Sequence, residues 1–503
     1  MPRQFVLIMT DTTRKDMLGC YGDERMKTPV LDALAENGIR YERAYCAQPV
    51  CGPARSALFT GTAPHSNGVV TNSVPLGMNV KTVGQRLSDN GILAAYTGKW
   101  HLDGADYFGL GICPDGWDEE TWYEMHNYLE ELSDEQRKRS RRSETAWDED
   151  WTRQMTYAHR VSNKAIEFLD SHRDDDFLLI VSYDEPHGPC ICPPPFNAMY
   201  EGFQFNDSPA YHDNLEDKPL YQRLWAGDDL AKDSEALRAP STMLSLFLGC
   251  NSFVDDEIGR VLEHIDDGAL VIFTSDHGDM LGSHKLQAKN AAFYDEITNI
   301  PFIVRPSKRH EHNCGVVVDY PTSHIDITPT ILDFFGVPIP KLLEGVSMLS
   351  QFEDPTVKIN DYVYCEFTRY EIDHDGFGGL QMMRSITDGR YKLTIHLLDS
   401  DELYDLERDR HEVVNRINDP SYASVRNRLH DRLLERMDHS RDLYRGYQWA
   451  VRPWRDDKQR RWQNSGYTRQ RENEEYEARQ WDYDTGLPMK EAVRSKLLYD
   501  VKR

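Results

Sequence analysis

The stretch ALVIFTSDHGD, residues 269–279, joins the pattern of a buried strand to a group of reactive side chains. Its first five residues are apolar, and Asp276 and His277 follow after two hydroxyl-bearing residues. A short, continuous apolar run is typical of a strand that is buried on both faces of a sheet. Groups that directly follow such a strand lie at its carboxyl end, which is where open α/β sheets bind ligands.

Four other short apolar runs repeat this pattern, and helical stretches separate them. We expect all five runs to be buried parallel strands in an α/β fold. The intervening helices are predicted from their apolar spacing and from Gly stop signals. The other runs cover residues 5–9, 92–96, 177–181 and 302–304, and the helices cover 29–37, 79–90 and 244–265. Together they predict a large, mainly parallel sheet between helices, in a catalytic domain of residues 1–383.

Polar residues follow three more of these runs in the same way. Asp11 follows the first run, Lys99 and His101 the second, and Asp184 and His187 the third. An ordinary polar residue that leaves a strand for water explains one such case, but it does not explain four together. Because the carboxyl ends of parallel strands meet at one edge of a sheet, we expect these side chains to gather there.

The C-terminal part of the chain has a different pattern. Residues 385–396 alternate around Asp388-Gly389, which predicts a β-hairpin. A short strand near residues 403–406 and a helix near 422–437 complete a small α+β domain, residues 384–445. Residues 446–503 lack clear periodicity, and we expect an irregular arm that packs on its own domain or on another subunit to form a homo-oligomer.

Composition excludes several classes of protein. The formal net charge of −26 disfavours nucleic acid as a partner, because binding phosphates requires a basic surface. The apolar runs are far shorter than the roughly 20 residues that cross a bilayer, so we expect no membrane partner. Nine scattered cysteines make no disulfide framework. The run at residues 5–9 is interpreted as a strand and not a signal peptide, which predicts a cytoplasmic protein.

The segment Cys51-Gly52-Pro53-Ala54-Arg55 opens a predicted helix. Cys51 would lie at the helix start, where free N–H groups and the helix dipole favour an anion, and Arg55 would lie one turn further on the same side. A buried structural thiol and a redox thiol of lowered pKa are the alternative interpretations of Cys51.

This segment resembles the Cys-x-Pro/Ala-x-Arg signature of the type I, formylglycine-dependent sulfatases of the alkaline phosphatase superfamily. Similar blocks follow in the same order over roughly residues 4–440, and the chain looks closest to a bacterial cytoplasmic sulfatase-like branch. These blocks are Gly98–Leu102, Pro186-His187, Ser275–Asp279, Lys289 with residues 293–296, and Ser323–Thr330. The resemblance implies an alkaline phosphatase-like fold with a smaller C-terminal antiparallel sheet and helix.

The resemblance also implies the chemistry. A separate maturation enzyme would oxidise Cys51 to formylglycine, whose hydrate attacks sulfur and later expels sulfate as the aldehyde reforms. One divalent metal would be held by Asp11, Asp276, His277 and the formylglycine oxygen of Cys51. Calcium is the expected ion, and magnesium and manganese are alternatives. Thr12 departs from the family pattern, because many sulfatases carry a second Asp there.

The remaining catalytic roles come from the same resemblance. Arg55, Lys99 and His101 would surround the formylglycine, with His101 as the base that starts sulfate release. His187 and Lys289 would bind the sulfate oxygens, and either could protonate the leaving alcohol. These cations would supply the local positive pocket that the acidic chain otherwise lacks.

The substrate is expected to be a small sulfated carbohydrate. Residues 366–379 mix charged, aromatic and glycine residues as a binding loop does, and Arg369 and His374 are its candidate sugar-binding residues; a surface loop with its own ion pairs is the alternative. Two other functions stay open from the sequence. One is a phosphonate or phosphate ester hydrolase of the same superfamily, and the other is a non-catalytic sulfatase-like binding protein.

Overall fold

The computed structural model describes residues 2–104, 107–239, 241–307, 314–372, 379–457, 481 and 485–488. Contacts along the chain form two compact units, Met1–Tyr422 and Ala423–Arg503. The domain boundaries predicted at residues 383/384 and 445/446 stay predictions. Within the described ranges, no helix is both long enough and apolar enough to cross a membrane.

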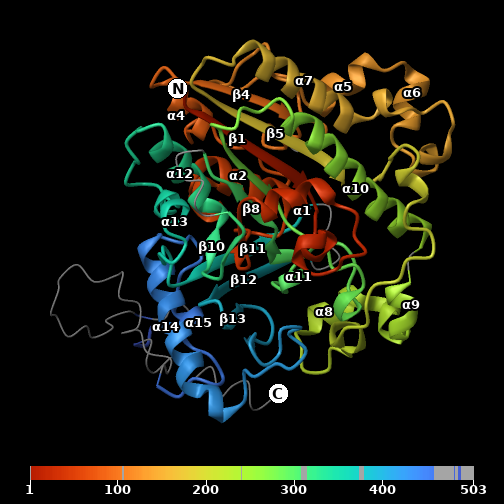
Figure 1. Cartoon of the computed structure of the whole chain (residues 1–503). Helices are drawn as coiled ribbons and strands as arrows, with labels where there is room; N and C mark the ends of the chain where they lie inside the picture. Colours follow the sequence, from red (N-terminus) through yellow and green to blue (C-terminus); the bar gives the residue numbers. More distant parts are fainter. Residues whose placement is uncertain are drawn as a thin grey trace. The chain divides into compact units, whose positions relative to one another are not determined.

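A seven-stranded sheet forms the centre of the first unit (Figure 1). Its strand order is β4-β5-β1-β6-β8-β2-β9, and the first four strands in this order are parallel, as predicted. The strands are β1 (Gln4–Asp11), β2 (Ile39–Tyr41), β4 (Leu93–Gly98), β5 (Phe177–Pro186), β6 (Leu270–Ser275), β8 (Phe302–Arg305) and β9 (Val316–Val318).

Alternate residues of β1 fill two separate cores, one on each face of the sheet. Val6 and Ile8 belong to the core that also holds residues of α7 (Tyr157–Ser171) and α10 (Thr242–Leu262). Leu7 and its same-face neighbours belong to the core that holds residues of α2 (Cys51–Thr60) and α12 (Ile327–Phe334). Figure 1 shows these two helix pairs on opposite sides of the sheet. A sheet covered on both faces explains why its strands are continuous apolar runs.

The direction of β8 differs from the prediction, because β8 runs antiparallel to its neighbour β6. A parallel neighbour needs a crossover that returns the chain to the opposite edge of the sheet. Between β6 and β8 the only α-helix is the single-turn α11 (Asp295–Thr298), so the chain re-enters the sheet from the edge it has just left. The sheet is therefore mixed, although it is mainly parallel.

Two smaller sheets accompany the large one. The first is the three-stranded sheet β10-β3-β7, from Thr322–Ser323, Ala44–Tyr45 and Asn299–Ile300. The second is antiparallel and contains β11 (Val363–Arg369), β12 (Leu380–Thr387), β13 (Tyr391–His396) and β14 (Glu402–Asp405). The predicted hairpin is confirmed as β12–β13, and Gly389 supplies the positive φ of 92° that its turn requires.

Except for α14, the remaining α-helices are short, and most lie in the connections of the first unit. The predicted helix 79–90 is reduced to α4 (Val83–Ser88), because Thr82 and Gln85 form a capping box that starts the helix there. The others are α1 (Pro29–Glu36), α3 (Pro64–Asn67), α5 (Met125–Glu131), α6 (Asp134–Arg139), α8 (Leu220–Ala226), α9 (Ser234–Arg238) and α13 (Leu349–Glu353), with α14 (Ala423–His439) and α15 (Tyr447–Ala450) in the second unit.

Candidate active site

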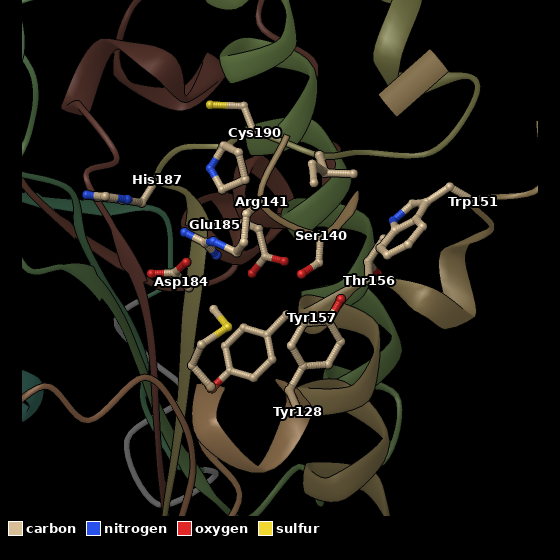
Figure 2. Close-up of a pocket in the computed structure, with 13 residues that line it drawn as sticks. Tyr128, Ser140, Arg141, Trp151, Thr156, Tyr157, Asp184, Glu185, His187 and Cys190 are labelled. Carbon is tan, nitrogen blue, oxygen red and sulfur yellow. The ribbon is translucent and has the colours of Figure 1, made fainter. Parts of the chain in front are cut away.

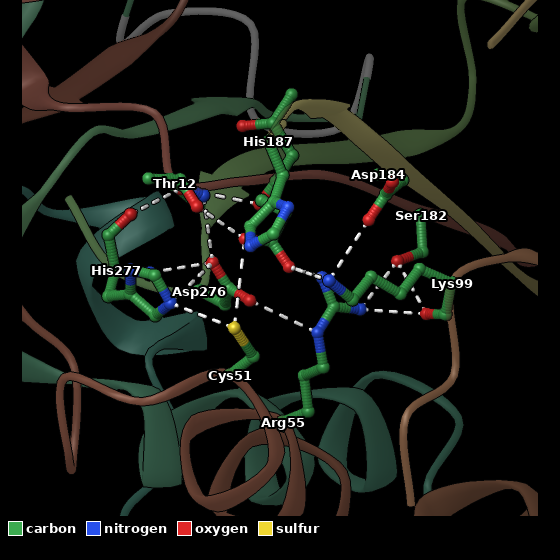
Figure 3. Close-up of polar contacts among 12 residues, drawn as sticks. Thr12, Cys51, Arg55, Lys99, Ser182, Asp184, His187, Asp276 and His277 are labelled. Carbon is green, nitrogen blue, oxygen red and sulfur yellow. Dashed lines mark hydrogen bonds and ion pairs between the residues drawn. The ribbon is translucent and has the colours of Figure 1, made fainter. Parts of the chain in front are cut away.

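Four strand ends and one helix start meet at a buried cluster (Figure 3). Asp11 is the last residue of β1, Lys99 follows β4, Asp184 lies near the end of β5, and Asp276 follows β6. Cys51 is the first residue of α2. All five side chains are buried. The gathering of strand-end residues expected from the topology is therefore present in the structure.

The backbone next to Cys51 packs closely against the side chain of Asn72. Val50 is extended and precedes the first helical residue, so Cys51 sits where the helix still has free N–H groups. The side-chain oxygen of Asn72 accepts a hydrogen bond from the Gly52 N–H at 2.8 Å. A Cβ on Gly52 would lie 3.1 Å from that oxygen, so glycine lets Asn72 approach the helix start.

The residues expected to hold a metal form one cluster. The ligand atoms of Asp11, Cys51, Asp276 and His277 all lie within 4.8 Å of one another. Cys51 Sγ lies 3.2 Å from His277 Nε2 and 3.8 Å from Asp11 Oδ1. His277 Nδ1 lies 2.9 Å from the carbonyl of Gly278, to which it donates, so Nε2 is the ring nitrogen that faces the cluster. Two carboxylates and an oriented imidazole fit a divalent cation.

Thr12 orders the two carboxylates. Its hydroxyl donates to Asp11 Oδ1 at 2.5 Å, and its backbone N–H donates to Asp276 Oδ1 at 3.1 Å. Thr12 adopts a positive φ of 71°, which turns its N–H toward Asp276. A second Asp at this position would add a negative charge, whereas Thr12 adds only hydrogen bonds. The donor set therefore has one negative charge fewer than a site with Asp at position 12 would have.

Two cations neutralise the carboxylates. The Arg55 guanidinium contacts Asp276 Oδ2 at 3.1 Å and Asp11 Oδ2 at 3.3 Å, and it donates to the Lys99 carbonyl at 2.7 Å. Lys99 Nζ lies 2.6 Å from Asp11 Oδ2 and 2.9 Å from Asp184 Oδ1. Although burial opposes ionisation, Lys99 and the other nearby cations hold the pKa of Asp11 well below its usual range. Asp11 is therefore ionised and available as a ligand.

A second pair of basic residues faces the cluster from the end of β5 and from the loop after β6. Lys289 Nζ lies 3.2 Å from His187 Nε2. Burial, followed by the charges of Lys289 and Lys99, lowers the pKa of His187 to about 3. The neutral imidazole can therefore accept a hydrogen bond from the Lys289 ammonium.

Comparison with known proteins identifies the family. The family model described as sulfatase matches residues 3–337, which is more than half of the chain. The chain belongs to the sulfatase family. A second model, described as the C-terminal part of N-sulphoglucosamine sulphohydrolase, matches residues 282–439. The protein is thus an enzyme of the sulfatase family, with the alkaline phosphatase-like fold that was expected.

Relatives of this sulfatase are recognisable in sequence and in structure. It is 41% identical over 496 residues to a protein of Escherichia coli (strain K12) described as uncharacterized sulfatase YidJ, with 96% of each chain covered. A protein solved in complex with its substrate D-glucosamine-2-N,6-O-disulfate has a TM-score of 0.71 at 21% identity, over 88% of this chain and 99% of the other. A phosphonate monoester hydrolase of Agrobacterium radiobacter has a TM-score of 0.71 at 23% identity, over 87% and 96%.

Two further predicted site residues, His101 and Arg369, lie in the described part of this sulfatase. His101 adopts a positive φ of 61° and is buried, and its ring lies 5.4 Å from that of Tyr107. Arg369 ends β11, and its carbonyl accepts a hydrogen bond from the Gln48 side chain. His374 lies outside the described residues. The catalytic and binding roles assigned to all these residues stay predictions.

Sequence reasoning missed two residues that contact the site. Asn72 caps the start of α2, and its amide also donates to Glu371 at 3.1 Å. Tyr107 contacts both Asp184 and His187. Neither residue follows a strand or belongs to a recognised block, so no local pattern marks it. A polar residue in a loop becomes a site residue only through the path that the loop takes.

A small cavity lies beside Asp184 and His187, which are among the residues that line it (Figure 2). It has a volume of about 30 Å³, which is room for about two water molecules. Figure 2 shows the Glu185 side chain directed into it, and in the described part of the chain Glu185 Oε2 has no hydrogen-bond partner. Burial, followed by the charge of Asp184, raises the pKa of Glu185 to about 8. The cavity is lined by Asp184, His187, Arg141 and Trp151, among other residues.

Proposed function

We propose that this sulfatase uses formylglycine at position 51 and one divalent cation to remove sulfate from a small sulfated carbohydrate. One observation carries the proposal: Cys51 opens a buried helix, and its sulfur faces two carboxylates and an imidazole that form a metal-sized cluster. A structural thiol needs no such surroundings. Oxidation of Cys51 would give the formylglycine aldehyde, and addition of water to it would give a geminal diol, with one hydroxyl to attack sulfur and another whose deprotonation releases sulfate.

The cation would be held by Asp11, Asp276, His277 and the converted residue 51. When bound, it would withdraw electrons from a sulfate oxygen and lower the pKa of the attacking hydroxyl. Calcium is our first choice because two carboxylates dominate the donor set; the same oxygens keep magnesium open, and the imidazole keeps manganese open. Without the cation, the Asp276 charge, against the opposing effect of burial, raises the pKa of His277 to about 9. Binding of the cation would therefore release a proton from His277.

We assign the remaining catalytic roles to basic side chains of the protein. Arg55 is committed to Asp11, Asp276 and the Lys99 carbonyl, so its role is to hold the carboxylates in place. Lys289 and His187 face one another, and we assign Lys289 to the sulfate oxygens, with His187 as the residue that orients its ammonium. We keep His101 as the base for sulfate release, because its Nδ1 has no partner among the described residues.

The substrate class is inferred from charge and from the structural neighbours. A chain with a net charge of −26 repels a long sulfated polymer, while one small ester can enter a locally positive pocket. The neighbour solved with D-glucosamine-2-N,6-O-disulfate supports a sugar of that size. Arg369 and His374 are our candidates for contacts with the sugar. Maturation by a separate oxidising enzyme, a cytoplasmic site of action and a homo-oligomer formed through the C-terminal arm belong to the same proposal.

A phosphonate or phosphate ester hydrolase is the second candidate. The structural likeness to a phosphonate monoester hydrolase favours it, and so does Thr12, because a site with one fewer negative charge tolerates a more highly charged substrate. The third possibility left open by the sequence, a binding protein without catalysis, is disfavoured by membership of the sulfatase family. The two candidate hydrolases differ in the ester that is cleaved.

The deciding experiment combines peptide mass with ester hydrolysis. In protein from its natural host, the peptide that contains residue 51 should be about 18 Da lighter than the cysteine form, the difference expected for conversion of the thiol carbon to an aldehyde. The same sample should hydrolyse an aryl sulfate faster than an aryl phosphate with the same leaving group, and Cys51→Ala should abolish turnover while the fold persists. An unmodified thiol in an active enzyme would refute the mechanism, and a preference for phosphate would favour the second candidate.

A further inference from the structure

Tyr107 links Asp184 and His187, the two site residues at the end of β5. Its hydroxyl donates to Asp184 Oδ1 at 2.5 Å and lies 3.0 Å from His187 Nδ1. The ring of Tyr107 also lies 4.0 Å from Lys99 Nζ, in a cation–π contact. Lys99 in turn is paired with Asp184 at 2.9 Å. Tyr107 therefore contacts three side chains of the site and is itself held on both its hydroxyl and its ring.

We infer that Tyr107 is a positioning residue that holds His187 in its neutral, Nδ1-protonated form, so that Lys289 supplies the proton to the leaving alcohol. The inference rests on the proposed ester hydrolysis, because it names which of two basic residues acts as the acid. It makes His187 an acceptor that orients Lys289 and does not itself give up a proton.

The hydrogen-bond donors and acceptors around His187 determine which of its ring nitrogens carries the hydrogen. The single hydroxyl proton of Tyr107 is directed to the Asp184 carboxylate, so the Tyr107 oxygen can only accept from His187. The other neighbour of His187 Nδ1 is the carbonyl of Gly188 at 3.1 Å, which is also an acceptor. Nδ1 must therefore carry the hydrogen. On the other side of the ring, the Lys289 ammonium can only donate hydrogen bonds, so Nε2 accepts one from Lys289 through its lone pair.

The hydrogen bonds form one directed series. Lys289 donates to His187 Nε2, His187 Nδ1 donates to Tyr107, and Tyr107 donates to Asp184, which is also ion-paired with Lys99. A second proton on His187 would place a third positive charge beside Lys289 and Lys99. Burial and these two charges keep the pKa of His187 near 3, in agreement with the assignment made from geometry.

This arrangement determines how the leaving alcohol is protonated. As the bond between sulfur and the alcohol oxygen breaks, its electron pair passes to that oxygen. One N–H bond of Lys289 breaks at the same time, and an O–H bond forms, which leaves Lys289 as a neutral amine that solvent reprotonates. His187 keeps its single proton throughout and fixes the direction of the Lys289 ammonium.

The nitrogen resonances of His187 test the assignment without any need for turnover. We would record ¹⁵N spectra of histidine-labelled protein and identify the His187 signal by its loss in His187→Gln. The wild-type signal should be that of the neutral Nδ1–H form from pH 5 to pH 8. Tyr107→Phe removes one acceptor of the Nδ1–H, so it should shift the Nδ1 resonance, while the Gly188 carbonyl and Lys289 remain as partners of the ring. Tyr183→Phe is the matched control, since it removes a buried hydroxyl on β5 that contacts Ser162, and it should leave the signal unchanged.

A wild-type signal with the proton on Nε2, or on both nitrogens at neutral pH, would overturn the inference. An identical His187 signal in wild type and Tyr107→Phe would overturn the role of Tyr107. Because the spectrum is independent of catalysis, a correct signal in a protein that hydrolyses no ester would refute the proposed function and leave the assignment of His187 standing.

Kinetics with two leaving groups test the role of Lys289. A nitrophenol leaves without help, whereas a sugar or alkyl alcohol needs a proton. Lys289→Ala should therefore lose about 10²–10⁴-fold more kcat on an alkyl sulfate than on a nitrophenyl sulfate, the range expected for a general acid. His187→Gln should reduce kcat on the two esters by similar factors. The reverse pattern, with the leaving-group dependence in His187→Gln, would assign the acid to His187 and overturn the inference.

Discussion

At the scale of single residues, Asp276 combines two tasks. Its carboxylate contacts Arg55 and is one of the four groups of the metal-sized cluster. Asp276→Asn removes the charge and keeps the shape, so it should weaken metal binding and reduce ester hydrolysis by about 10²-fold or more, the scale of one lost electrostatic group. Elemental analysis of the purified variant, together with its kcat, checks both effects.

Asp255→Asn provides the comparison for Asp276. Asp255 is also fully buried, but its carboxylate accepts hydrogen bonds from the backbone N–H groups of Val30 and Leu31, away from the cluster. It should alter stability and leave the metal content unchanged. Full metal content and full activity in Asp276→Asn would contradict the assignment of this residue.

Substitution of Arg369 tests whether this residue contacts the sugar of the substrate. If it contacts the sugar and not the sulfate, Arg369→Ala should reduce kcat/KM on a carbohydrate sulfate at least about tenfold more than on a simple aryl sulfate, because about 1.4 kcal/mol of binding energy corresponds to a factor of ten. Its place at the end of β11, with its carbonyl beside Gln48, puts it near the segment that precedes Cys51. Equal losses on the two esters would remove Arg369 from the sugar-binding residues.

At the scale of elements, the end of β4 depends on close contact with β5. Gly98 adopts a φ of 109°, and a Cβ there would lie 1.8 Å from the Ser182 carbonyl oxygen. The next residue, Lys99, donates its N–H to the same carbonyl and presents its own carbonyl to Arg55. Gly98→Ala should therefore lower the free energy of unfolding by more than about 2 kcal/mol and impair activity, because the strand end must move.

Gly68→Ala separates crowding from backbone strain. Gly68 also has a positive φ, 92°, but nothing lies within 4 Å of an added Cβ. This variant should lose about 1–2 kcal/mol, the cost of a left-handed conformation alone, and should keep its activity. Urea unfolding of both variants measures the difference. Equal losses of stability would show that the contact between β4 and β5 can adjust.

At the scale of the whole molecule, the response of stability to pH depends on buried acids such as Glu185. Its pKa of about 8 in the folded protein exceeds its ordinary value of 4.5, so between these pH values the folded chain holds a proton that the unfolded chain has released. Stability must then fall as pH rises through this window. Glu185→Gln removes this loss, so relative to wild type it should gain up to about 1.4 kcal/mol per pH unit.

Urea unfolding of both proteins at pH 5, 6, 7 and 8 measures this trend. The Gln side chain can still accept the hydrogen bond that Glu185 receives from the Ala158 N–H, so the comparison isolates the charge. Glu135→Gln, an identical change on the exposed side of α6, is the control and should show no such trend. A constant difference between Glu185→Gln and wild type across this range would mean that Glu185 is ionised in the folded protein.

Much of the site was predictable from short-range pattern. Continuous apolar runs mark strands covered on both faces, and parallel strands bring their carboxyl ends to one edge, so Asp11, Lys99, Asp184 and Asp276 could be placed together before their contacts were known. One helical turn separates Cys51 from Arg55, which puts both at the same start of α2. These inferences need only the residue periodicity of a helix or strand and the end at which the chain leaves it.

Other features depend on contacts between segments far apart in the chain. The direction of β8 follows from the route of the connection before it, and Tyr107 joins the site only because its loop reaches Asp184, 77 residues further on. Asn72 contacts the start of α2 for the same kind of reason, and the burial of Glu185 comes from the packing around β5. Packing, burial and the partners of a titratable group are properties of three-dimensional proximity, which no local pattern of residues encodes.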